Sequence, residues 1–182
     1  MRVVAVVGLP GSGKSEAAAV ARQLDIPVVT MGDVIRQECR DRGLDPATHH
    51  GSVAKALREE NGVGAVAERT IPVVENELTD NDIVLIDGVR SDAELDRFRE
   101  TFGEDMELIR IDAPDAARAE RLELRGRDAD ETDGGEALEE RDRRELAFGM
   151  DAAMEQADTV IDNDNSLETF RSRVREYLIK HE

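Results

Sequence analysis

The feature that most constrains this chain is the segment Gly8-Leu9-Pro10-Gly11-Ser12-Gly13-Lys14-Ser15. It matches G-x-x-x-x-G-K-[ST] at every fixed position, and it lies between a strand pattern at residues 3–7 and a helical pattern at residues 13–24. Glycines let consecutive backbone N–H groups turn inward around an anion, and the N-terminus of the following helix adds a positive dipole end. We therefore predict a loop that binds the phosphates of ATP, made by Gly8, Gly11, Ser12, Gly13, Lys14 and Ser15.

Three residues in or near this loop have chemistry suited to phosphoryl transfer. We expect Lys14 to reach the β- and γ-phosphates and to act in catalysis, and Ser15 to ligate Mg²⁺. Asp87 ends the apolar strand pattern of residues 83–86, where a carboxylate can hold the metal directly or through water. The alternative for Asp87 is a cap on the next helix, but Ser91 is better placed for that role.

Strand and helix patterns alternate along the chain, which is typical of an α/β protein with a parallel sheet covered on both faces. We predict a three-layer P-loop NTPase sandwich with a five-stranded parallel sheet, formed as a single domain over residues 1–182. The pattern predicts strands at residues 3–7, 26–30, 83–87, 106–111 and 159–161. It predicts helices at residues 13–24, 33–42, 46–60, 62–77, 91–101, 114–125, 136–156 and 166–180, with a polar loop at 126–136. Because residues 33–77 show no strand, we interpret them as a helical insertion.

The composition excludes several classes of protein. The 182 residues carry a net charge of -18, which disfavours binding to nucleic acid or to anionic membranes. Only three of the 24 basic residues are lysines, a balance that indicates a salt-rich cytoplasm or an ordinary acidic protein. Cys39 is the single cysteine, so no disulfide framework or cysteine zinc cluster is expected. The apolar run near the N-terminus is too short for a signal segment or membrane span, and we expect a cytoplasmic protein.

Four segments resemble parts of known kinases. Residues 32–36, Gly-Asp-Val-Ile-Arg, resemble the T-G-D-x-x-R element of adenylate kinases, with Met31 where that family has Thr. Residues 87–90, Asp-Gly-Val-Arg, resemble their D-G-[FY]-P-R element without the proline, and residues 118–127 resemble the arginine-rich entry to their lid. Residues 157–163 are similar to the A-D-x-V-I-x-N segment of dephospho-CoA kinases. The whole chain resembles an archaeal family of P-loop proteins described as dephospho-CoA-kinase-like or adenylate-kinase-like.

The resemblance implies a role for each matching residue. Arg36 and Arg90 would hold a phosphate of the acceptor in a site built on residues 33–77, and Asp33 would act near the acceptor as a base or metal-water ligand. A lid over residues 121–144 would place arginines near the base or the phosphates. These lid residues are Arg121, Arg125, Arg127, Arg141 and Arg144, of which Arg125 and Arg141 are the expected catalytic residues and Arg121 the expected nucleotide contact. Asn163 would line the adenine pocket.

These residues leave three functions open. The leading hypothesis is an ATP- and Mg²⁺-dependent kinase that phosphorylates a small, phosphorylated or nucleotide-like acceptor, such as dephospho-CoA or a nucleoside monophosphate. The alternatives are a P-loop ATPase or nucleotide-dependent regulator, and a binding module without turnover. An acceptor site needs Arg36 and Arg90, whereas the alternatives do not. The adjacent His49 and His50 are interpreted as part of a loop or of the acceptor rim rather than as metal ligands. We expect a monomer or weak homodimer.

Overall fold

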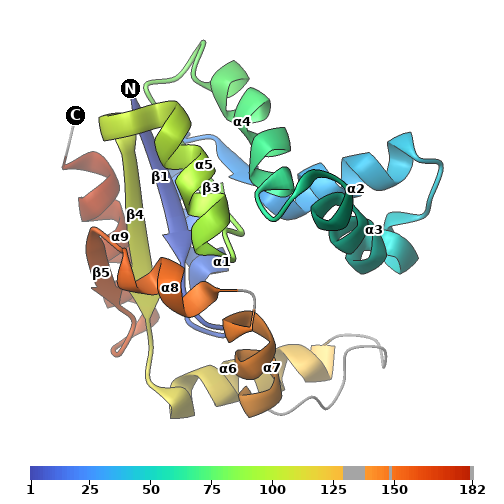
Figure 1. The fold of residues 1–182 in the computed structure, drawn as a ribbon. Coiled ribbons are helices and arrows are strands. Elements are labelled where there is room, and N and C mark those ends of the chain that lie inside the picture. Colours follow the sequence, from blue (N-terminus) through green and yellow to red (C-terminus); the bar gives the residue numbers. More distant parts are fainter. Residues whose placement is uncertain (129–137, 148, 181–182) are drawn as a thin grey trace.

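A five-stranded parallel sheet forms the centre of the molecule (Figure 1). The computed structural model describes residues 1–128, 138–147 and 149–180, apart from the side chains of 125–128, 141 and 144. The strands are β1 (Arg2–Val7), β2 (Val28–Thr30), β3 (Ile83–Asp87), β4 (Met106–Asp112) and β5 (Thr159–Asp162). They run in the order β2-β3-β1-β4-β5, and every neighbouring pair is parallel. This arrangement confirms the predicted α/β P-loop class.

Strand β1 lies at the middle of the sheet because it is apolar on both faces. Val3, Ala5 and Val7 pack into one core, and Val4 and Val6 pack into the other. Helices α1 (Lys14–Gln23) and α9 (Leu167–Ile179) cover the second face. Helices α5 (Asp92–Phe102) and α8 (Met150–Glu155) cover the first, together with α4 (Ala65–Glu77). The carboxyl end of β1 leads directly into the phosphate loop, at the edge of this three-layer core.

Three helices fill the chain between β2 and β3, as the absence of a strand pattern there predicted. They are α2 (Met31–Asp41), α3 (Pro46–Asn61) and α4, and they lie to one side of the sheet, packed into the same core as its first face (Figure 1). Asp45 caps α3 by accepting a hydrogen bond from the Ala47 N–H at 3.0 Å, and Pro46 occupies the first turn. We call this group the helical insertion.

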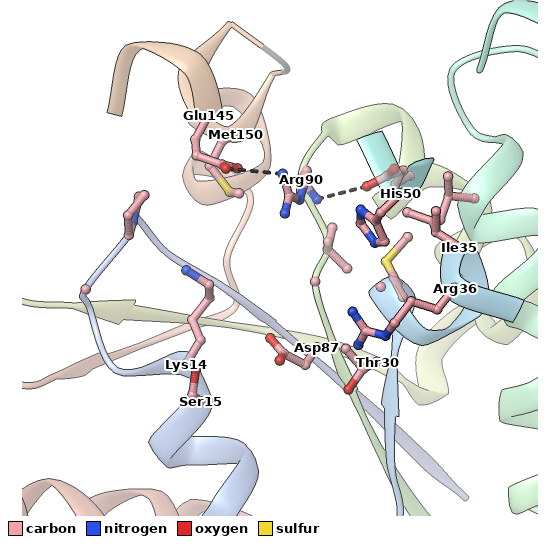
Figure 2. A pocket seen from close by; sticks show the side chains of 18 of the residues that line it. Lys14, Ser15, Thr30, Ile35, Arg36, His50, Asp87, Arg90, Glu145 and Met150 are labelled. Atoms are coloured by element: carbon pink, nitrogen blue, oxygen red, sulfur yellow. Dashed lines mark hydrogen bonds and ion pairs between the residues drawn. The ribbon is translucent and has the colours of Figure 1, made fainter. Parts of the chain in front are cut away.

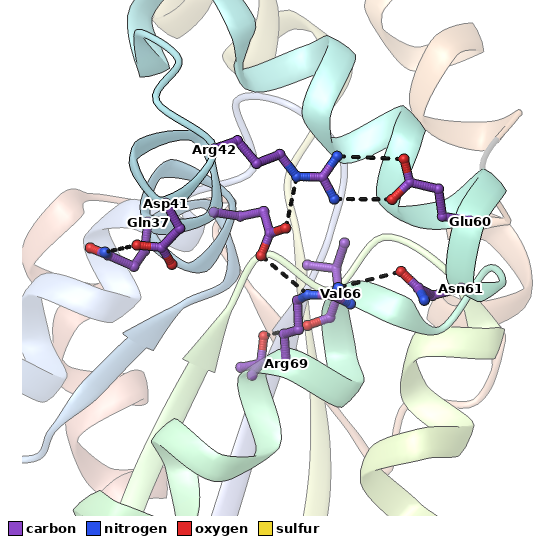
Figure 3. A network of polar contacts seen from close by, with 9 residues as sticks. Gln37, Asp41, Arg42, Glu60, Asn61, Val66 and Arg69 are labelled. Carbon is purple, nitrogen blue, oxygen red and sulfur yellow. Dashed lines mark hydrogen bonds and ion pairs between the residues drawn. The ribbon is translucent and has the colours of Figure 1, made fainter.

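A network of charged side chains joins the three helices of the insertion (Figure 3). Arg42 donates to Glu38 at 2.8 Å and to Glu60 of α3 at 3.0 Å. Arg69 of α4 donates to Glu38 at 3.4 Å and to Asn61 at 3.3 Å. The hydrogen bond from Arg42 holds the pKa of Glu38 below its usual value. A single exposed pair contributes little, but Arg42 and Arg69 both contact Glu38 of α2 and each also contacts α3, so the network links all three helices.

Two predicted boundaries near the lid are wrong. The helix expected at residues 136–156 is two helices, α7 (Leu138–Leu146) and α8, because Gly149 takes a φ of 92° and begins α8 as its N-cap. Helix α6 (Asp115–Asp128) continues beyond residue 125, into the start of the predicted loop.

Local signals elsewhere predicted the helix starts correctly. Ser91 accepts from the Glu94 N–H at 3.2 Å, and Ser166 accepts from the Thr169 N–H at 3.2 Å. Among the described residues, no helix has the length and apolar character needed to cross a membrane.

Candidate nucleotide and acceptor site

The phosphate loop is packed so closely that side chains cannot replace its glycines. Gly13 has a φ of 118°, and a Cβ there would collide with the side-chain amide of Asn163. Gly8 has a φ of 152°, and a Cβ there would lie 2.5 Å from the carbonyl oxygen of Ile111. A Cβ on Gly11 would lie 2.8 Å from the carbonyl oxygen of Arg118. The loop therefore has the tight, side-chain-free backbone that a phosphate cradle requires.

Lys14 begins α1 and lies over this loop. Its Nζ donates to the carbonyl oxygens of Gly8 at 2.5 Å and Leu9 at 3.2 Å. Lys14 and Ser15 also line a cavity beside the loop. An ammonium and a hydroxyl are thus placed side by side where the loop meets the cavity.

Asn163 and Arg121 support the loop from behind. Asn163 follows β5 and is buried, and its Nδ2 donates to the carbonyl oxygen of Ser12 at 2.7 Å. Arg121 donates to Asn163 Oδ1 at 3.2 Å and to the carbonyl oxygen of Gly11 at 3.1 Å. Both residues were predicted to contact the nucleotide. The structure brings them to the loop backbone, and their contact with the base stays a prediction.

Arg118 connects the loop to the helices on either side of the lid. Its side chain is 3% exposed and donates to the Pro10 carbonyl oxygen at 3.1 Å. It forms ion pairs with Asp142 of α7 at 2.7 Å and with Asp115 of α6 at 2.8 Å. The hydrogen bond with Asp142 is the main cause that raises the pKa of the Arg118 guanidinium further, so this cation stays charged.

Two predicted catalytic residues lie outside the described side chains. Arg125 belongs to α6 and Arg141 to α7, but the positions of their guanidinium groups are not part of the described structure. The same holds for Arg127 and Arg144. Their roles stay predictions.

A cavity of about 420 Å³ lies between the phosphate loop and the helical insertion (Figure 2). Lys14 and Ser15 lie on one side of it, Arg36 and His50 on the other, and Asp87 lies between them. Arg90 and Glu145 close a further side. One cavity therefore joins the predicted phosphate site to two residues predicted to bind the acceptor.

Asp87 has the surroundings expected of a metal-binding carboxylate. It ends β3, opposite Val6 of β1 and Thr30 of β2 in the sheet register. Burial raises the pKa of Asp87, and Lys14 is the strongest of the nearby cations that oppose this rise. With Ser15 it offers hard oxygen ligands, which suit Mg²⁺. The described residues include no group of three His, Cys, Asp or Glu side chains that could hold a metal by themselves. A magnesium ion held here would take its other ligands from phosphate and water.

Both predicted acceptor arginines have acidic partners. Arg36 donates to Oδ1 of Asp33 from Nε at 2.9 Å and from Nη2 at 2.6 Å. Asp33 has a 67% exposed side chain and does not belong to the cavity lining, and its catalytic role stays a prediction. Arg90 donates to Glu145 of α7 at 3.2 Å.

Three charged residues of the cavity were not predicted as site residues. Arg58 of α3 pairs with Glu94 of α5 at 3.0 Å, and Glu94, 1% exposed, also accepts from the Arg90 N–H at 2.9 Å. Glu145 pairs with Arg90 across the cavity. The Ser91 and Glu94 spacing was visible in the sequence but indicated only a helix cap. His50 lines the cavity, in agreement with the acceptor-rim interpretation.

Comparison with known proteins identifies the family. Residues 7–139 match the family described as an AAA domain. A UPF0200 protein from Halobacterium salinarum is 55% identical over 178 residues, which cover 98% of this chain and 93% of that protein. A UPF0200/UPF0201 protein from Archaeoglobus fulgidus is 46% identical over 99% of this chain and 56% of that protein. The chain belongs to the UPF0200 family, which confirms the predicted resemblance to an archaeal P-loop family.

Solved structures share the fold. A Thermus thermophilus protein has a TM-score of 0.66 at 19% identity, covering 100% of this chain and 98% of that one. A gluconokinase from Sinorhizobium meliloti has a TM-score of 0.58 at 17% identity, covering 98% and 92%. A shikimate kinase from Bacteroides thetaiotaomicron has a TM-score of 0.58 at 16% identity, covering 97% and 98%. At these identities the likeness establishes a P-loop kinase-like fold.

Proposed function

We propose that this protein transfers the γ-phosphoryl group of ATP to a small acceptor bound against the helical insertion. The observation that carries this proposal is the cavity itself. Its lining joins Lys14 and Ser15 on one side, Asp87 in the middle, and Arg36 and Arg90 on other sides. A nucleotide switch or binding module has no need of a second, arginine-lined end to the phosphate site.

The proposed chemistry depends mainly on positioning and charge. Bound Mg²⁺ would neutralise the phosphate oxygens, and Ser15 and Asp87 are the residues that would hold it. Lys14 supplies a compact positive charge for the transferring group, which carries its charge on three equatorial oxygens. Burial of Asp87 strengthens its interaction with a nearby cation, because the charge is poorly solvated.

The acceptor is proposed to be a small molecule that carries phosphate or a nucleotide. The likeness to proteins named gluconokinase and shikimate kinase supports a small-molecule acceptor of some kind. The arginines Arg36 and Arg90 support an acceptor with negative charge, because guanidinium groups bind phosphate and carboxylate in a bidentate manner. We further propose a monomer or weak homodimer that works in the cytoplasm, where ATP and Mg²⁺ are supplied.

We propose that the region 121–144 acts as a lid over the nucleotide. Arg118 and Asp142 tie its two flanking helices to the phosphate loop, which supports coupling between lid position and loop geometry. Closure of such a segment would exclude water from the transferring group.

A phosphotransfer screen tests the proposal. Purified protein is incubated with ATP and Mg²⁺ in concentrated KCl, with dephospho-CoA, nucleoside monophosphates or a crude metabolite pool, and products are identified by mass spectrometry. We expect one acceptor to gain a phosphoryl group, and the Lys14→Ala variant to lose this activity while keeping its fold. Release of ADP and phosphate without a phosphorylated acceptor would favour the ATPase or regulator. Full activity in Lys14→Ala would refute both.

A further inference from the structure

Three nitrogen atoms converge on one point at the acceptor end of the cavity. Residue 32 is a glycine, and a Cβ placed there would lie 3.6 Å from Arg36 Nη1, 3.7 Å from Arg36 Nη2 and 3.7 Å from His50 Nε2. Gly32, Arg36 and His50 all line the cavity, and Figure 2 shows Arg36 and His50 side by side on the wall that faces Lys14. The space is open because residue 32 has no side chain.

Two of these nitrogens are available to a ligand. His50 Nε2 is buried and has no hydrogen-bond partner within the described structure. Arg36 uses Nε and Nη2 for Asp33, and among the described residues Nη1 has no hydrogen bond. A buried polar atom without a partner is costly to the folded protein, so such atoms mark places where a ligand or water completes the bonding.

The charges around this point favour a negative ligand. Cationic groups of three elements face His50, and each has a carboxylate partner: Arg36 of α2 with Asp33, Arg58 of α3 with Glu94, and Arg90 after β3 with Glu145. Glu94 and Glu145 also line the cavity, whereas Asp33 does not. The positive charge of Arg36 is therefore the one least offset inside the cavity.

We propose that His50 Nε2 and Arg36 together bind an anionic oxygen of the acceptor, a phosphate or a carboxylate, in the space beside Gly32. This inference rests on the proposed function in that it names the group by which the acceptor is held. His50 is then a specificity-determining residue, since an acceptor without an anionic group leaves its buried nitrogen unpaired.

Burial lowers the pKa of His50, and the positive charges of Arg36, Arg90 and Arg58 lower it further. An interaction between the His50 ring and the Gly32 backbone raises the pKa and so opposes part of this lowering. His50 is thus neutral at neutral pH. A bound anion favours the imidazolium form, so it raises the pKa of His50, and by linkage the anion binds more tightly as the pH falls through that pKa. A rise of about one pKa unit corresponds to about tenfold tighter binding to the charged imidazole.

The experiment follows the imidazole NMR signals of the three histidines against pH, with inorganic phosphate in one arm and acetate in the other. The His50→Gln variant assigns the His50 signal. We expect at least one anion to raise the pKa of His50 by about one unit. A response to phosphate alone identifies a phosphate site, and a response to acetate alone identifies a carboxylate site.

Gly32→Ala is the decisive variant. The new methyl group meets its neighbours only at 3.6–3.7 Å, so the helix accommodates it, yet it fills the space where the three nitrogens converge. We expect the melting temperature to hold and the anion to bind at least about tenfold more weakly. Three results would overturn the proposal. They are a change of the His50 signal by the anion that is as strong in Gly32→Ala as in the wild type, no change in the wild type at all, and a change that is lost only in Lys14→Ala. ADP binding, measured on the same proteins, tests the proposed function separately, because failure to bind ADP would refute that function whatever His50 does.

Discussion

Replacing Arg118 with methionine should destabilise the protein more than any exposed arginine substitution, because the change breaks a buried ion-pair network. The guanidinium is 3% exposed, and its main partner Asp142 is 18% exposed. Methionine keeps the apolar stem of the side chain and removes the guanidinium, so the carboxylate of Asp142 and the carbonyl of Pro10 lose their donor. The variant therefore tests mainly the loss of these polar contacts.

The expected magnitude follows from the exposure of each partner. Removing one member of a buried pair costs about 3–5 kcal/mol, and we take the lower end because Asp142 retains some contact with water. Asp115 is 87% exposed, so its pair with Arg118 adds almost nothing. A loss of about 3 kcal/mol lowers the melting temperature of a chain of this size by roughly 6–12 °C.

Thermal unfolding followed by circular dichroism, in one buffer of fixed KCl concentration, measures this effect. Asp115→Asn is the matched control and should change stability by less than about 0.5 kcal/mol. The double variant Arg118→Met with Asp142→Leu should recover part of the loss, since it leaves no unpaired buried charge. Equal, small effects of Arg118→Met and Asp115→Asn would refute the reasoning, because they would mean that burial of Arg118 does not strengthen its pair with Asp142.

Three further predictions concern the loop, the metal site and the net charge. Gly13→Ala should abolish ADP binding in calorimetry, because its Cβ collides with Asn163, whereas Gly51→Ala, with nothing within 4 Å, should leave binding intact. Asp87→Asn should stabilise the protein at neutral pH in denaturant titrations and abolish Mg²⁺-dependent nucleotide binding. The reason is that the pKa of Asp87 is raised in the folded state, so the ionised carboxylate destabilises the fold above that pKa. This destabilisation disappears as the pH falls through the folded-state pKa. If Asp87→Asn remained equally stabilising in acid, this assignment of the pKa shift would be wrong. Raising the KCl concentration should raise the melting temperature, because screening relieves the repulsion of a net charge of -18, and an unchanged melting temperature would contradict that effect.

The structural features that the sequence predicted well are those decided by residues close together in the chain. The phosphate loop needs only its own glycines, the preceding strand and the following helix, and all of them are contiguous. Asp87 could be recognised because a strand of known direction ends at it. The caps Ser91 and Ser166 each act on an N–H three residues away. All of these features depend on residues that are close together in the chain, so the local sequence is enough to predict them.

The features that were missed depend on packing between distant segments. Arg118 is buried only because α7 brings Asp142 against α6, a contact between residues 24 positions apart. The sequence did not predict the break before α8, because the helical spacing of apolar residues continues across residues 147–149. The turn is visible only in the structure, where Gly149 takes a φ of 92°. The sequence left His49 and His50 in a loop or on the acceptor rim without distinguishing them, because the placement of His50 in the cavity depends on how α3 packs against α2.

Packing between distant segments also makes the three arginines of the cavity unequal, although the sequence offers no reason to rank them. They are Arg36, Arg58 and Arg90. Glu94 and Glu145 are 1% and 12% exposed and both line the cavity, so each brings a negative charge to the cavity wall beside its arginine. Asp33 is 67% exposed and lies outside the cavity lining, and water screens its interaction with Arg36. Arg36 is therefore the arginine whose charge is least offset within the cavity, next to the unpaired nitrogen of His50. An anionic acceptor should be held first at Arg36 and His50, and contact with Arg90 requires it to compete with Glu145.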